Sequence, residues 1–147
     1  MPDDRSGLAE VRTFSSTPIA AGESEFTRFA FAEMIDQHAV DVLQPDLAIT
    51  GGFSEGLKIA ALCESHRLEL APHCWGSAIS FRAGLTLAFA SSAGQYMEVP
   101  MGGDPLLREM AAIDLELKDG MLRPPTGAGW GVEPDPGFVK RFAMNRK

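Results

Sequence analysis

The chain has 147 residues, 45% of them hydrophobic and 22% charged, a composition typical of one globular domain and unlike a disordered chain or a disulfide scaffold. A formal charge of -7 argues against nucleic acid or an anionic membrane surface as a partner, and no apolar run is long enough to predict a membrane-spanning helix. The presence of only two cysteines, and a start at Met1–Arg5 that lacks the pattern of a secretory signal, favour a cytoplasmic location.

Short β-like runs alternate with amphipathic helical runs along most of the sequence. Strands are predicted where apolar runs end in turn-forming or polar residues, at 17–21, 40–44, 68–71 and 95–99. Helices are predicted where apolar side chains recur at helical spacing, at 25–37, 54–66 and 76–91. This alternation indicates parallel strands joined by right-handed crossover helices.

The tail has a different pattern. Residues 114–117 and 121–123 flank Asp119-Gly120, a pair that favours a tight hairpin turn. Residues 135–144 are predicted to form a closing helix, with Pro136 at its first turn.

Four side chains able to transfer a proton or bind a metal lie at, or just past, the ends of the predicted strands: Glu23, Asp46, His73 and Glu98. Because parallel strands end at the same face of an α/β fold, we expect these groups to lie close together. Three carboxylates and an imidazole could serve a divalent metal and a general base. The pattern alone leaves simpler roles open, because Glu23 could stabilise the start of the next helix and Asp46 could form a turn after Pro45.

Several short motifs occur in an order and spacing that resemble those of the C-terminal barrel half of the enolase superfamily, in its mandelate racemase and muconate lactonizing enzyme branch. The motifs are Pro-Ile-Ala-Ala-Gly-Glu at 18–23, Leu-Gln-Pro-Asp at 43–46, Gly-Gly-Phe-Ser-Glu at 51–55, Pro-His-Cys at 72–74 and Tyr-Met-Glu at 96–98. The resemblance extends over nearly the whole chain, roughly residues 2–140.

The resemblance implies a role for each of the four residues. Glu23 matches a carboxylate ligand of the catalytic Mg²⁺. Asp46 and His73 match a dyad in which the imidazole exchanges a proton with the carbon next to a substrate carboxylate, and Glu98 matches the acid near a substrate carboxylate oxygen. Such a reaction needs a cation and a hydrogen-bond donor, because the enediolate that forms carries concentrated negative charge.

The implied fold is α/β, namely the C-terminal half of a (β/α)-barrel with about four parallel strands and a C-terminal hairpin. Residues 1–147 would form this partial domain, without the first four barrel strands and the N-terminal capping domain. The implied protein is a fragment of a magnesium-dependent acid-sugar dehydratase or hydroxy-acid racemase, and the isolated chain would hold an incomplete metal site. Four strands leave two open edges, so we expect the chain to form a homo-oligomer or to pair with a missing N-terminal half.

A second reading of the sequence stays open. The chain could be a non-catalytic remnant whose exposed inner sheet serves self-association or partner binding. A third possibility is a misplaced start within a longer protein.

Overall fold

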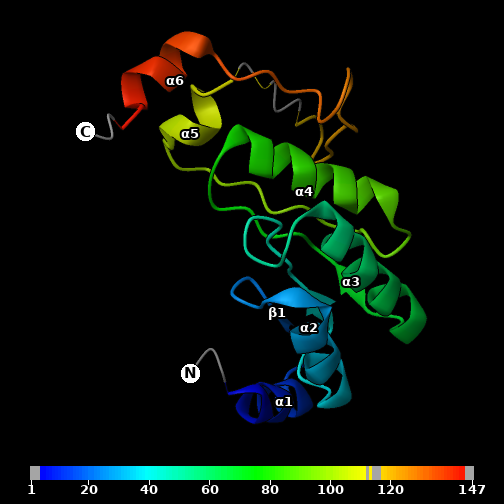
Figure 1. The fold of residues 1–147 in the computed structure, drawn as a ribbon. Helices are drawn as coiled ribbons and strands as arrows, with labels where there is room; N and C mark the ends of the chain where they lie inside the picture. Colours follow the sequence, from blue (N-terminus) through cyan, green and yellow to red (C-terminus); the bar gives the residue numbers. More distant parts are fainter. Residues whose placement is uncertain (1–3, 112, 114–116, 145–147) are drawn as a thin grey trace.

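A computed structural model describes residues 4–111, 113 and 117–144. In chain order the elements are α1 (Arg5–Phe14), β1 (Ala20–Ala21), α2 (Thr27–Asp36), β2 (Val42–Leu43), α3 (Phe53–His66), β3 (Glu69–Leu70), α4 (Ala78–Ala90), α5 (Pro105–Arg108) and α6 (Pro136–Phe142). The helices follow one another from α1, at one end of the molecule, to α5 and α6 at the other (Figure 1).

The sheet is parallel and has the order β1-β2-β3, with Val42 opposite Ala20 on one side and Glu69 on the other. Helices α2 and α3 are the crossovers between these strands, which confirms the α/β class and the alternation predicted from the sequence. All three strands are shorter than the predicted ones, and each is paired over only two residues.

The fourth predicted strand differs from the expectation. Instead of a strand over 95–99, the chain makes a single parallel bridge one residue earlier, between Gly94 and Leu70. The Leu70 N–H donates to the Ala93 carbonyl at 2.8 Å, and the Gln95 N–H donates to the Leu70 carbonyl at 3.3 Å. Among the described residues this segment has a ladder partner on one side only, so few backbone hydrogen bonds hold it extended.

The tail contains the predicted turn. Lys118 and Met121 form an antiparallel bridge, and Asp119 and Gly120 have φ of 54° and 76°, the left-handed geometry of the favoured hairpin turn. Residues 114–116, on one predicted arm of this hairpin, lie outside the described residues. Helix α6 begins at Pro136 after Asp135, whose carboxylate accepts the Phe138 N–H at 2.6 Å.

Two short helices were not predicted. Helix α1 is capped by Asp4, which accepts the Gly7 N–H at 2.8 Å, and none of its residues is buried. It packs on the core only through Leu8, which is partly buried. Helix α5 spans four residues and buries Leu107. Helix α5 is too short to show a periodic pattern. Helix α1 is amphipathic, so its pattern could have predicted it, although it buries little apolar surface.

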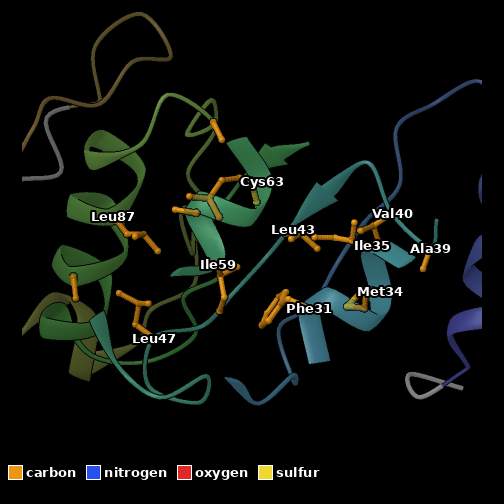
Figure 2. Close-up of a cluster of buried hydrophobic side chains, with 14 residues drawn as sticks. Phe31, Met34, Ile35, Ala39, Val40, Leu43, Leu47, Ile59, Cys63 and Leu87 are labelled. Atoms are coloured by element: carbon orange, nitrogen blue, oxygen red, sulfur yellow. The ribbon is translucent and has the colours of Figure 1, made fainter. Parts of the chain in front are cut away.

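The main core lies where α2, α3 and α4 cover the sheet. Phe31 from α2, Ile59 from α3 and Leu87 from α4 are all 0% exposed and belong to one apolar cluster with Leu43 and Leu70 of the strands. Figure 2 shows Phe31, Leu43, Ile59 and Leu87 among the side chains of this cluster. Burying each of them contributes about 1.5–3 kcal/mol, so the sheet and its covering helices form one packed layer pair.

A second cluster lies beyond α4. It contains Cys74, Phe81, Leu85 and Leu107, with Met97 and Val99 packed against it. It thus anchors the segments that follow β3 and Gly94, which carry His73 and Glu98. Within the described ranges, no helix combines the length and apolarity needed to cross a membrane.

Candidate active site

His73 and Asp46 form a directly hydrogen-bonded pair just beyond the ends of β3 and β2. The imidazole Nδ1 lies 2.9 Å from the Asp46 Oδ2. The two residues are also partners in an isolated parallel bridge, and the His73 N–H donates to the Pro45 carbonyl at 3.2 Å. Backbone pairing therefore sets the distance between the two side chains.

The Asp46 carboxylate is held on both of its oxygens. Oδ1 accepts the Ala48 N–H at 2.8 Å, while Oδ2 faces the imidazole. The side chain is 4% exposed. An aspartate fixed in this way accepts a hydrogen bond from Nδ1–H, which leaves the Nε2 lone pair of the neutral ring free to act as a base.

The Nε2 edge of His73 faces two more carboxylates. It lies 3.3 Å from the Glu23 Oε2 and 3.9 Å from the Glu98 Oε2. The Glu23 side chain is 63% exposed and that of Glu98 is 41% exposed, whereas His73 is only 12% exposed. The structure thus brings together all four residues selected from the sequence, with the imidazole at the centre.

Glycine is needed just before Glu23. Gly22 has φ of 129°, and a Cβ at this position would lie 2.7 Å from the Phe31 ring. The chain therefore leaves β1 over a buried aromatic ring and reaches the site at once. The Glu25 N–H donates to the Gly22 carbonyl at 3.1 Å and closes the turn that carries Glu23.

The four groups do not form a complete metal site. Among residues 4–111, 113 and 117–144, no group of three or more His, Cys, Asp or Glu side chains is arranged to hold a metal ion. Mg²⁺ prefers near-octahedral oxygen coordination, and here Asp46 is already engaged with His73 and Ala48. One buried oxygen of Glu98, Oε2, has no hydrogen-bond partner. The described residues thus leave acidic oxygens at the site but provide too few ligands for the ion.

Cys74, although adjacent to His73, is not a nucleophile candidate. Its side chain is fully buried, and burial raises the pKa of the thiol to about 11. Trp75, by contrast, is 73% exposed. Trp130 does pack, with its ring centroid 4.9 Å from that of Phe53.

The architecture defines the class of protein. It is a partial parallel α/β barrel that presents an imidazole–carboxylate pair at the carboxyl ends of neighbouring strands. Residues 1–138 match the family of enolase C-terminal domain-like proteins, and the chain belongs to that family.

Similar proteins agree with this assignment. The chain is 38% identical over 137 residues to a D-galactonate dehydratase of Ralstonia pickettii, a match that covers 89% of this chain and 36% of the relative. It is 31% identical over 152 residues to a D-galactarolactone cycloisomerase of Agrobacterium fabrum, covering 98% of this chain and 40% of the relative.

Solved structures show the same fold. The 3,6-anhydro-D-galactonate cycloisomerase of Zobellia galactanivorans matches with a TM-score of 0.87 and 30% identity, over 97% of this chain and 40% of that protein. An enolase superfamily member from Polaromonas sp. JS666 matches with a TM-score of 0.87 and 31% identity, over 98% and 39% of the two chains. The fold is therefore the C-terminal barrel half of this superfamily, and the chain spans well under half the length of these relatives.

Proposed function

We propose that this chain supplies the proton-abstracting part of a magnesium-dependent enzyme of the mandelate racemase-like type, which acts on a hydroxy acid or an acid sugar. The observation that carries the proposal is the 2.9 Å contact between His73 Nδ1 and Asp46 Oδ2, which turns Nε2 toward the carboxylates of Glu23 and Glu98. The cytoplasmic location expected from the cysteine content is part of the same proposal.

Each residue has a distinct part in the proposed reaction. Nε2 of His73 takes the proton from the carbon next to the substrate carboxylate, while Asp46 fixes the ring and stabilises the imidazolium that forms. Glu98 is the acid near a substrate carboxylate oxygen. Glu23 would serve as one ligand of a Mg²⁺ ion, together with carboxylates that this chain does not supply, and such an ion would provide positive charge next to the substrate carboxylate.

The test is incorporation of deuterium next to the carboxylate of D-galactonate in D₂O, followed by proton NMR. The chain is mixed with Mg²⁺ and a separately produced polypeptide that carries the first four barrel strands and the capping domain of the Ralstonia pickettii relative. We expect exchange that falls by about 10²–10⁴-fold in His73→Ala, with a similar direction in Asp46→Asn. If D-galactonate and a panel of other acid sugars all exchange no faster than with His73→Ala, the proposal is refuted.

A second candidate function rests on exposed apolar side chains. Phe26, Trp75 and Met101 are 68%, 73% and 80% exposed, and each follows one of the site carboxylates or His73 by two or three residues. An apolar surface of this kind is typical of a face that another protein covers. We propose partner binding or self-association as the alternative, which predicts a concentration-dependent sedimentation coefficient that is insensitive to Mg²⁺ and acid sugars.

A further inference from the structure

Helix α2 does not cap its own amino end. Its cap position is Phe26, which has no side-chain oxygen, and the cap makes no side-chain hydrogen bond. Two N–H groups of its first turn instead donate hydrogen bonds to a segment more than twenty residues later in the sequence. The Thr27 N–H donates to the Thr50 carbonyl at 3.0 Å, and the Arg28 N–H donates to the Glu55 Oε1 at 3.0 Å.

Glu55 is the centre of this arrangement. Besides the Arg28 N–H, its carboxylate accepts the Arg28 Nη1 at 2.7 Å and 3.0 Å and the Lys58 Nζ at 3.1 Å. The side chain is 13% exposed. Because Glu55 also lies in the first turn of α3, one carboxylate sits at the positive ends of two helices.

The linked backbone is strained where the two segments meet. Thr27 has φ of 58°, a conformation that a β-branched residue rarely adopts. Such a conformation persists only where surrounding contacts over-determine it. The N–H groups of Thr27 and of the next residue both donate to the segment 50–55. These two hydrogen bonds are therefore the contacts that hold Thr27 in this conformation.

The two linked segments carry the site. Glu23 lies four residues before Thr27, and Asp46 lies four residues before Thr50, whose own N–H donates to the Asp46 carbonyl at 2.7 Å. We propose that Glu55, acting through Arg28 and the strained Thr27, is a positioning residue that sets Glu23 against the His73–Asp46 pair. The role assigned to this geometry rests on the proposed function.

The first test uses NMR of the full chain and requires no catalysis. At one fixed pH, Glu23→Gln is expected to move the His73 Nε2 signal, which shows that the ring reports the placement of Glu23. In Glu55→Gln this sensitivity disappears, and amide hydrogen exchange at Thr27 and Arg28 accelerates at least tenfold. If Glu23→Gln moves the ring signal equally in both backgrounds, the proposal is overturned.

The chain provides a matched control on the same helix. Glu64 lies near the other end of α3, where its carboxylate accepts the Ser92 N–H at 2.9 Å and the hydroxyls of Ser91 and Ser92 at 2.8 and 3.0 Å. Glu64→Gln also removes charge-assisted bonds between elements, but we expect it to leave the His73 signal and the exchange at Thr27 unchanged. An equal effect of both variants would reduce Glu55 to a general stabilising role and refute the proposal.

Rescue by glycine tests the strain directly. Glycine adopts a φ of 58° without steric cost, so adding Thr27→Gly to Glu55→Gln should restore the response of His73 to Glu23→Gln. Failure of this rescue overturns the part assigned to Thr27. In the deuterium assay, Glu55→Gln should lower the exchange rate more than it changes the substrate KM. If the NMR results are as expected but no deuterium is incorporated into any acid sugar, the positioning role of Glu55 stands and the proposed function is wrong.

Discussion

Gly94, which forms an isolated bridge with Leu70 of β3, should not tolerate even one added methyl group. A Cβ at this position would lie 1.9 Å from the Ala88 carbonyl oxygen, 2.7 Å from its carbon and 2.9 Å from the Ala88 Cα. The shortest of these distances falls short of an ordinary 3.4 Å contact by about 1.5 Å. All three atoms are backbone near the end of α4, so no side-chain rotation relieves the clash.

The cost of Gly94→Ala is therefore expected at the upper end of overpacking, about 3 kcal/mol. With a urea m-value of about 2 kcal/mol/M, the unfolding midpoint should fall by roughly 1.5 M. Urea titrations followed by circular dichroism and tryptophan fluorescence measure this shift. Gly103→Ala is the matched control, because its Cβ would meet no atom within 4 Å. A Gly94→Ala midpoint equal to that of the control would refute the reasoning.

Three further predictions concern acid stability, thiol reactivity and the core. Hydrogen bonding to the Arg28 N–H lowers the pKa of Glu55 from 4.5 to about 2, so the stability that this carboxylate contributes to the fold is complete above pH 4.5 and lost as the pH falls through about 2. Glu55→Gln should lower the melting temperature at neutral pH and make the melting temperature less dependent on acid pH. An unchanged profile of melting temperature against pH would contradict this prediction. Burial raises the thiol pKa of Cys63 to about 12 and of Cys74 to about 11, so iodoacetamide at pH 8 should label neither until denaturant is added, as mass spectrometry would show. Leu43→Ala removes a fully buried side chain and should cost about 2–5 kcal/mol in urea unfolding, whereas a loss below about 1 kcal/mol would argue against this core.

The helices that cover the sheet were predictable because their apolar spacing is produced by the burial itself. The helix predicted at 54–66 is α3 at Phe53–His66, and its buried face includes Ile59, Ala60 and Cys63. The grouping of His73, Asp46, Glu23 and Glu98 was predictable for a related reason. Parallel strands end on one face, so residues at strand ends meet whatever the loops do.

Other features depend on contacts between segments far apart in sequence. The sequence suggests that Glu55 serves its own helix, and nothing near it reveals that its main partner, Arg28, lies 27 residues earlier. The extent of the fourth strand was wrong because pairing, rather than the pattern over 95–99, decides where a strand forms at an edge.

The pairing of Asp46 with His73 across adjacent strands has a consequence for engineering. An isolated bridge between their backbones, rather than a flexible connection, fixes how far apart these two side chains stand. New side chains can therefore be introduced at 102 and 103, where the two glycines have open space around them, without changing the spacing of this imidazole–carboxylate pair.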